Sequence, residues 1–411
     1  MKTKTTARRK TSALPMGGDN GVPILMSPSG PVRKEELLAL RRDIHRHPEL
    51  GFQETRTSAL VQTHLRALGL APKVLAGTGV TALVPGGSEG RTLMIRSDLD
   101  ALPVQEENPD DFRSRNAGVM HACGHDFHAA ILLGVTKSLV QDPPSRGRVK
   151  LNFQPAEEGL NGAAAMIRDG IMESPKVDAV LGYHVWQEIP VGKIGVVTGP
   201  AMAAVDRFRI TVTGKGGHAA YPHGSIDPIL VSAHIVTALQ SVVARNVDPL
   251  DCAVVTVGQI HSGSAFNVIP PSATLEGTCR TFSQEAGKTV PRRVTEIAAS
   301  VARALGARAE VAMVREHNAL VNDARMAEFV REVARDVIGK RNVIDSKPSM
   351  GGEDHEAYQA LVPGCYAFLG AGRKSGERFP HHHPKFNPDE GVLEIGVAVM
   401  AEAARRWLAG A

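Results

Sequence analysis

The hydrophobic positions along the chain follow two periods, and the two occur in alternation. Leucine and isoleucine recur every three or four residues between Pro31 and Pro48, which predicts an amphipathic helix. Further on, short apolar runs typical of buried strands alternate with runs of helical period. We expect strands at 80–84, 92–95, 149–153 and 179–183, and helices at 57–68, 126–140 and 162–169. This order predicts an α/β layer whose sheet is buried and largely parallel.

The pattern changes near Gly199, where polar and apolar residues begin to alternate singly. Residues 207–213 (RFRITVT) have the two-residue period of a half-exposed antiparallel strand. The same part of the chain predicts strands at 253–260, 273–282 and 309–314, with helices at about 227–245 and 289–305. The first pattern then resumes, with helices at 323–338, near Glu353 and at 389–408, and a strand at 365–369.

Together these patterns predict an α/β fold of two domains, of which the larger is discontinuous. Residues 31–199 and 316–411 would form the larger domain, with a mixed, largely parallel sheet between helices. Residues 200–315 would form an inserted α+β domain, and residues 1–30 a loose tail. The composition agrees, because 411 residues that are 43% hydrophobic and 22% charged can bury a sizeable core.

Charge, aromatic content and cysteine usage narrow the function. A net charge of +4 and an aromatic content of 4% provide neither a basic surface nor stacking platforms for nucleic acid. No apolar run approaches the roughly 20 residues of a membrane helix, and the basic N-terminal segment lacks the hydrophobic stretch of a secretory signal. Four widely spaced cysteines imply no disulfide framework. We therefore expect a cytoplasmic protein without nucleic-acid or membrane partners, with organelle targeting as the alternative.

Sixteen histidines are many for this length, and the densest cluster of residues that could carry chemistry is the segment HACGHD at 121–126. Cys123 and His125 are two residues apart, so an extended backbone would point both side chains to the same side. A thiolate and an imidazole are good ligands for a metal such as zinc. Asp126 stands where it could cap the following helix. A buried structural cysteine and histidine are the alternative interpretation of this segment.

Two further segments place metal-binding residue types at the ends of predicted strands. Glu157 and Glu158 follow the strand 149–153, and the carboxyl ends of strands are where open α/β sheets bind ligands. One carboxylate could bind a metal while its neighbour acts as a base on water, although a solvated surface turn is the alternative. His184 ends the next strand, and the segment PHHHP at 380–384 offers one more ligand without indicating which histidine supplies it. These donors would suffice for two metal ions.

The motifs of this chain, taken in order, resemble a family of metal-dependent amidohydrolases. That family includes hippurate hydrolase, bacterial N-acyl-amino-acid hydrolases and plant auxin-conjugate hydrolases, and it is related to aminoacylases and carboxypeptidases. The resemblance covers residues 33–404, and its segments are RRDIHRHPELGFQE, RSDLDALPVQEE, HACGHD, FQPAEEG, GYHVW, GKGGHAAYPH, AFNVIP and MGGEDH. It implies hydrolysis of N-acyl amino acids to a carboxylic acid and a free amino acid, with two divalent ions per subunit drawn from Mn, Zn, Co or Ni.

The resemblance also implies a role for each matching residue of the metal site. Glu157 would act as general base and then as general acid. Cys123 would bridge the two metal ions, and the other ligands would be His125, Glu158, His184 and His382. His382 is chosen because the family's ligand lies two residues before a proline, here Pro384. His381 and His383 occupy positions where the family usually has other residues.

Further roles implied by the resemblance lie outside that ligand set. The inserted domain would be a lid that also forms a homodimer, or a higher oligomer, and His218 would stabilise the oxyanion in the partner subunit's site. Asn267 and Arg280 would hold the substrate near its carboxylate, and Asp98 and Asp100 are expected to orient ligands rather than bind metal. The chain departs from the family after Glu353-Asp354, where a histidine replaces the usual aromatic residue and is expected to line the acyl pocket.

Three other functions remain open at this point. A dipeptidase or carboxypeptidase-like metallopeptidase would use the same residues. A thiol hydrolase would use Cys123 as nucleophile, but it would leave both glutamates and His184 without roles. A noncatalytic protein with a structural zinc is the third alternative, although such sites are closed, tetrahedral and usually richer in cysteine. The acyl group and the amino acid of the substrate are not specified by these residues.

Overall fold

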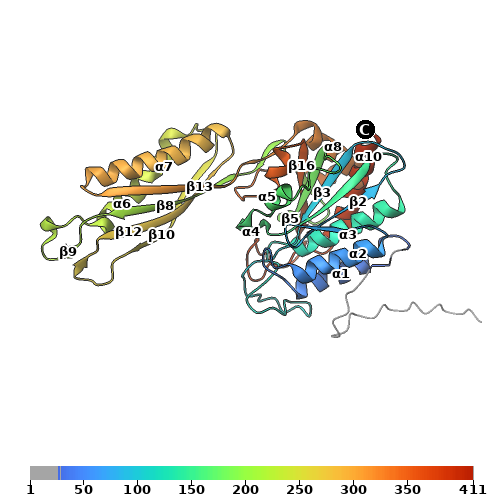
Figure 1. Cartoon of the computed structure of the whole chain (residues 1–411), viewed down its shortest axis with the longest axis horizontal. Coiled ribbons are helices and arrows are strands. Elements are labelled where there is room, and N and C mark those ends of the chain that lie inside the picture. The colour runs from blue at the N-terminus through green and yellow to red at the C-terminus, as the bar shows by residue number, and fades with distance from the viewer. Residues whose placement is uncertain (1–25, 28, 411) are drawn as a thin grey trace, which may run out of the picture.

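The computed structural model describes residues 26–27 and 29–410, which form two lobes joined by a narrow connection (Figure 1). The larger lobe is built on an eight-stranded sheet and the smaller lobe on a four-stranded sheet. Most of the predicted loose tail lies outside the described residues. Met26, near its end, is buried in the core of the larger lobe, so the chain is already packed there.

The sheet of the larger lobe is mixed, and this confirms the predicted fold class. Its strands, in spatial order, are β1 (Lys73–Leu75), β2 (Gly79–Pro85), β4 (Arg148–Gln154), β3 (Thr92–Asp98), β5 (Ala179–Pro190), β16 (Gly364–Gly372), β6 (Ile194–Val196) and β15 (Val343–Asp345). The four pairs β4–β3, β3–β5, β5–β16 and β6–β15 are parallel, and the other three pairs are antiparallel.

Helices cover both faces of this sheet, and β3 illustrates why its strands are apolar throughout. Leu93 and Ile95 face the main core, whereas Met94 faces a second cluster on the opposite side with Met166 and Tyr358. A strand that is buried on both faces carries no polar alternation. The helices of the larger lobe are α1 (Lys34–Arg46), α2 (Thr55–Ala67), α3 (His125–Gln141), α4 (Glu157–Leu160), α5 (Gly162–Arg168), α8 (Ala324–Ile338), α9 (Glu356–Gln359) and α10 (Val392–Ala409), with a short 3-10 turn η2 (Lys340–Asn342).

The smaller lobe has two helices on one face of an antiparallel sheet. Its strands lie in the order β10 (Ala253–Ser262), β12 (Ser272–Thr281), β8 (Ala204–Thr213) and β13 (Arg308–His317), and its helices are α6 (Pro228–Asn246) and α7 (Gln284–Ala304). Ile235 and Leu239 of α6 pack with Phe208 and Val294 in a separate hydrophobic core. Of the described helices, only α6 is long and apolar enough to cross a membrane by length and composition. It is also a core helix of this lobe.

Short strands complete both ends of the smaller lobe. β9 (Gly217–His218) pairs with β11 (Val268–Ile269) at the end far from the larger lobe, beside the 3-10 turn η1 (Pro222–Gly224) (Figure 1). At the other end, β7 (Gly199–Met202) pairs with β14 (Leu320–Asn322), and Val205 of β8 pairs with His317 of β13. The chain therefore enters and leaves the smaller lobe on neighbouring antiparallel strands.

The two largest differences in extent from the prediction are in α7 and β5, and local chemistry explains the first. Helix α7 begins at Gln284 rather than at 289, because the Ser283 hydroxyl accepts a hydrogen bond from Ala286 N at 3.0 Å and caps the helix. Gly287 and Pro291, which are poor helix residues, obscure that start in the sequence. Strand β5 continues to Pro190, so His184 lies within the strand and not at its end.

Candidate metal centre

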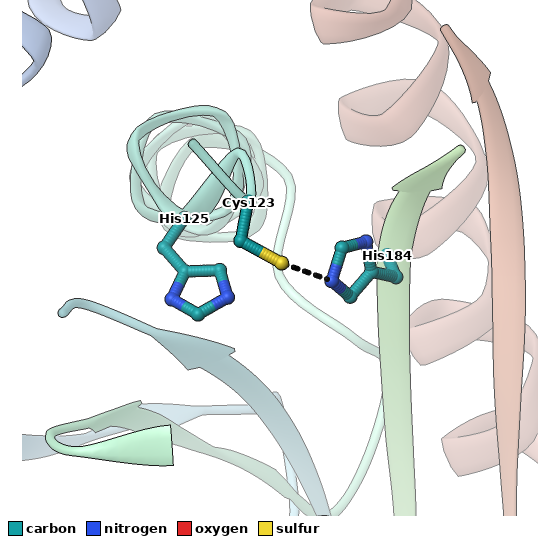
Figure 2. Close-up of side chains that lie close together, drawn as sticks. All are labelled: Cys123, His125 and His184. Atoms are coloured by element: carbon teal, nitrogen blue, oxygen red, sulfur yellow. Dashed lines mark hydrogen bonds between the residues drawn. The ribbon is translucent and has the colours of Figure 1, made fainter. Parts of the chain in front are cut away.

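Cys123, His125 and His184 meet beside the sheet, although they come from different elements (Figure 2). Cys123 Sγ lies 3.4 Å from His184 Nε2 on β5. The segment before α3 is a turn and not the extended backbone that we predicted, because Gly124 has φ 93°. A Cβ at this position would lie 2.4 Å from Val185 Cγ2, so only glycine fits. The turn, rather than strand alternation, brings Cys123 and His125 together.

Asp126 has a different role from the predicted helix cap. It lies inside the first turn of α3, is fully buried, and its carboxylate accepts hydrogen bonds from Arg41 at 2.7 Å and from His45 at 2.8 Å. These contacts fasten the start of α3 to α1. The short loop that carries Cys123 is therefore held to a rigid part of the larger lobe.

In His125 and in His184, one ring nitrogen lies against a backbone oxygen and the other faces the cluster of possible ligands. His125 Nδ1 lies 2.9 Å from Asp100 O, and its Nε2 has no hydrogen-bond partner among the described residues. His184 Nδ1 donates to Val185 O at 2.8 Å, which leaves Nε2 facing Cys123. Metal-binding histidines have this arrangement, in which one nitrogen donates to an oxygen and the other is free to bind a cation.

Glu157 and Glu158 approach the same place from the turn after β4. The turn contains three residues with left-handed backbone, Ala156 (φ 56°), Gly159 (φ 74°) and Asn161 (φ 56°). It directs Glu158 toward His382, whose Nε2 lies 3.3 Å from Glu158 Oε1. The possible ligand atoms form five overlapping groups, each within 4.8 Å: Cys123, His125 and His184; Asp98, His125 and His128; Cys123, Glu158 and His382; His125, Glu157 and Glu158; and Glu157, Glu353 and Asp354.

The electrostatics of this cluster favour a cation. Burial and the nearby charges of Glu158, Glu157 and Asp98 raise the pKa of the Cys123 thiol well above its usual value. Burial, Glu353 and Glu158 likewise raise the pKa of Glu157. Acidic groups are thus crowded together in a buried site, and a divalent cation is the kind of group that reverses such shifts. The free Nε2 of His125 and the thiol fit this cation chemically.

The three histidines of the segment 380–384 occupy distinct places. His382, which has a left-handed backbone with φ 68°, joins the group with Cys123 and Glu158. His381 is half-buried at the cleft beside His184, and its Nε2 lies 2.9 Å from Val185 O. The ring of His383 stacks on Phe379 and belongs to none of the possible ligand groups. This placement supports His382 as the ligand, which stays a prediction.

Asp98 and Asp100 contact the cluster in different ways. Asp100 Oδ2 accepts a hydrogen bond from Glu158 N at 2.9 Å, and its Oδ1 lies 3.1 Å from His125 Nδ1, so it links two proposed ligands. Asp98 accepts hydrogen bonds from His128 at 2.5 Å and from Arg96 at 2.6 Å. Its Oδ2 lies 3.7 Å from His125 Nε2. Both carboxylates are fully buried.

Sequence reasoning missed several polar residues that support the cluster. His128 Nε2 accepts a hydrogen bond from Val185 N at 3.0 Å, and its position three residues after His125 on α3 was the available sign. Arg96 is fully buried in the apolar strand β3 and pairs with Asp354 at 2.7 Å and with Glu353 at 2.8 Å. A lone arginine inside an apolar strand needs such partners, and this pattern could have identified it.

A cleft of about 440 Å³ opens onto the cluster and is lined by both lobes. Cys123, Glu157 and His184 form its base, Trp186 adds an aromatic wall, and Arg280 enters from the smaller lobe. His355 does not line this cleft, contrary to the expectation that it contacts the acyl group. It is completely buried, and the centre of its ring lies 5.0 Å from that of Tyr366 on β16.

His218 and Asn267 lie together at the far end of the smaller lobe, where Asn267 O accepts a hydrogen bond from Ala219 N at 3.1 Å. His218 is solvent-exposed. Arg280 is near the opposite end of β12, eight residues of extended strand from Ser272, or about 27 Å. Within one subunit, Arg280 therefore lines the cleft and His218 and Asn267 do not, and β9, which carries His218, lies at the end of the smaller lobe far from the larger lobe (Figure 1).

Comparisons with known proteins find relatives over nearly the whole chain. The model of the family "Peptidase family M20/M25/M40" matches residues 94–406. The N-acetyl-L-cysteine deacetylase of Bacillus subtilis is 40% identical over 95% of this chain and 93% of its own length. The IAA-amino acid hydrolase ILR1-like 4 of Arabidopsis thaliana is 38% identical over 90% and 86%. A solved dinuclear metal-binding peptidase of the M20 family from B. subtilis superposes with a TM-score of 0.79 at 35% identity, covering 92% of this chain and 99% of that one.

Proposed function

From the premise that this chain belongs to the peptidase family M20/M25/M40, we propose that it is a metal-dependent amidohydrolase that cleaves N-acyl amino acids to a carboxylic acid and an amino acid. One observation carries the proposal. A buried carboxylate, Glu157, lies at the base of a cleft beside five converging side chains of metal-binding types. A metallopeptidase acting on dipeptides is the alternative, because the same centre would serve it.

We propose that two divalent cations occupy this centre, as the name of the B. subtilis structural relative states for that protein. Cys123, His125, Glu158, His184 and His382 would hold them. When bound, such ions lower the pKa of a water molecule toward neutrality and polarise a carbonyl group. Which metal is bound in the cell depends on availability as well as on ligand type.

Glu157 is the proton carrier in this proposal. Its carboxylate faces the possible ligand groups of His125 and Glu158 but is outside the proposed ligand set. It accepts a proton as water attacks the amide carbonyl, and then donates that proton to the departing amine nitrogen. Burial in the cleft keeps bulk water from competing for the proton. Burial and the nearby Glu353 raise the pKa of Glu157, which favours the protonated form that the second step requires.

The smaller lobe supplies the substrate-binding groups. Arg280 lines the cleft, and we assign it to the substrate carboxylate. We further propose that residues 200–315 form a lid domain through which two copies associate, so that His218 and Asn267 of each copy reach the cleft of its partner. There His218 would donate a hydrogen bond to the developing oxyanion. We place the enzyme in the cytoplasm, because its four cysteines are free and sparse.

A hydrolysis screen tests the proposed reaction. Metal-depleted and metal-restored protein are incubated with N-acetyl amino acids, benzoyl-glycine, aromatic N-acyl conjugates and small dipeptides, and the released amine is quantified. We expect metal-dependent release from at least one class of N-acyl amino acid. Release from dipeptides alone would favour the metallopeptidase. Bound metal without hydrolysis of any compound would favour a noncatalytic protein.

Exchange of subunits tests the proposed role of His218. The variants Glu157→Ala and His218→Ala should each be nearly inactive alone. If His218 acts on its partner's site, co-expression of the two should restore about a quarter of the wild-type rate, because half of randomly assembled dimers would contain one complete site of two. A control with two differently tagged His218→Ala chains should restore nothing. Absence of complementation in purified mixed dimers would contradict action across subunits.

A further inference from the structure

The turn that carries Glu157 and Glu158 has an unfavourable backbone. Ala156 has φ 56° and ψ 46°, a left-handed conformation that residues with a side chain rarely adopt. Such a conformation persists only where its surroundings hold it in place. Ala156 O accepts a hydrogen bond from Gly162 N at 3.0 Å, which closes the turn on one side. The peptide N–H of Ala156 is bound separately, by a buried side chain.

Two buried carboxylates bind the peptide groups on either side of Glu157. Ala156 N donates to Glu54 Oε1 at 2.9 Å, and Glu158 N donates to Asp100 Oδ2 at 2.9 Å. Both hydrogen bonds run from the turn to segments more than fifty residues away in sequence. Glu157 is thereby fixed between two anchored peptide units, while its own carboxylate remains directed into the cleft.

The side chain of Glu54, which accepts the hydrogen bond from Ala156 N, is itself held in place by its surroundings. It is completely buried just before α2, and its second oxygen accepts a hydrogen bond from Thr78 Oγ1 at 2.5 Å. The preceding segment packs against the same turn, since a Cβ on Gly51 would lie 3.1 Å from Ala156 Cα. Glu49 O accepts a hydrogen bond from Ala101 N at 2.8 Å, which joins this segment to the loop of Asp100.

We propose that Glu54 is a positioning residue that holds Ala156 in its left-handed conformation and so sets the places of Glu157 and Glu158. Its catalytic consequence rests on the proposed function, because Glu54 touches neither the cleft nor any proposed ligand side chain. Without an acceptor at this position, the buried N–H of Ala156 would have no partner, and the backbone would relax away from the left-handed region. Both carboxylates would then move from the cluster.

Three substitutions should have different effects if Glu54 positions the turn, whereas a purely structural role would not distinguish them. Glu54→Leu removes the acceptor at similar size, Glu54→Gln keeps an acceptor oxygen, and Thr78→Val removes only the second hydrogen bond. Deuterium exchange of the peptides covering 155–163, competitive metal titration, and kcat with KM are measured on the full chain. These readouts report the turn, the proposed ligand Glu158 and the proposed base Glu157, respectively.

Glu54→Leu should raise exchange of the turn by at least about fivefold over wild type. It should also weaken metal binding by about 10–100-fold, as loss of a supporting hydrogen bond does elsewhere, and lower kcat by about tenfold with little change in KM. Glu54→Gln and Thr78→Val should remain within about threefold of wild type in all three measurements. Equal effects of the leucine and glutamine variants would overturn the proposal, as would unchanged exchange of the turn in Glu54→Leu.

The same substitution, Glu54→Leu, is also tested in a chain that carries Ala156→Gly. Glycine adopts the left-handed conformation without a steric penalty, so the turn should depend less on Glu54. The effect of Glu54→Leu on exchange should therefore shrink by at least about half in the Ala156→Gly chain, a coupling measured by a double-mutant cycle. Full additivity would overturn the proposal. If Glu54→Leu alone does not fold, the double variant should recover folding, and failure of both would equally overturn it.

These experiments distinguish this proposal from the proposed function. Exchange of the turn requires neither metal nor substrate, so it tests Glu54 even if the hydrolysis screen finds no substrate. Conversely, strong metal-dependent hydrolysis by a Glu54→Leu variant with wild-type exchange would leave the proposed reaction intact and remove only the positioning role.

Discussion

Replacement of Glu157 by alanine is expected to lower kcat by about 10²–10⁴-fold while both metal ions remain bound. Glu157 is the proposed carrier of the proton from water to the leaving amine. Among the described residues, it is the only carboxylate that is grouped with both His125 and Glu158 and is not itself a proposed ligand. Steady-state rates on the substrate found in the screen, with elemental analysis of the same preparation, measure both halves of this result.

Glu158 offers a matched control, because it is the same residue type on the same turn. Glu158→Ala should lose bound metal together with turnover, whereas Glu157→Ala should lose turnover alone. Glu157→Gln, which keeps the size of the side chain but cannot accept a proton, should be as inactive as Glu157→Ala. Turnover by Glu157→Ala above about a tenth of the wild-type rate would contradict the assignment of Glu157 as the base.

Removal of metal is expected to reduce hydrolysis to below about one hundredth of the restored rate. Without a cation, burial and the crowded acidic groups of the centre raise the pKa of Cys123 and of Glu157, which opposes the ionised forms that the reaction needs. Dialysis against a chelator followed by addition of Mn, Zn, Co or Ni measures the loss and its recovery. The depleted protein should also melt at a lower temperature, because ions that bind only the folded chain stabilise it.

The control for this experiment is the same chelator saturated with metal beforehand, which should leave activity unchanged. The outcome also decides between two mechanisms. A thiol hydrolase with Cys123 as nucleophile would keep its activity after depletion and would lose it to a thiol-alkylating reagent. Full activity of demonstrably metal-free protein would therefore contradict the proposed metal centre.

The alternation of strands and helices was enough to predict the fold class, because burial on both faces leaves a clear apolar run in each strand. Segment ends were harder to predict. Helix α7 starts earlier than predicted because Ser283 caps it, and β5 continues past His184. Neither feature leaves a clear mark in the hydrophobic pattern of the sequence. The short strands β6 and β15 were not predicted, because three residues carry too little periodicity.

Motif resemblance predicted the members of the candidate site, but the residues that hold them were visible only in three dimensions. Glu54 and Asp100 bind the turn of Glu157 from segments that no spacing rule connects. Predicting the position of His355 failed for a related reason. Whether a residue beside Glu353-Asp354 faces the cleft or the interior depends on how that loop packs, and the structure places His355 fully inside.

The position of β16 has a consequence for the synthesis of the chain. This strand lies between β5 and β6, yet it is made more than 160 residues after either of them. While the ribosome is still translating the smaller lobe, the edge of β5 that later pairs with β16 has no partner strand. An unpaired strand edge in an incomplete chain is prone to pair with other chains. His382, the last proposed ligand, lies ten residues after the end of β16, so it is synthesised just after the strand that closes the sheet. Maturation of the centre is therefore tied to completion of the polypeptide, and a chain cut short before β16 would carry neither.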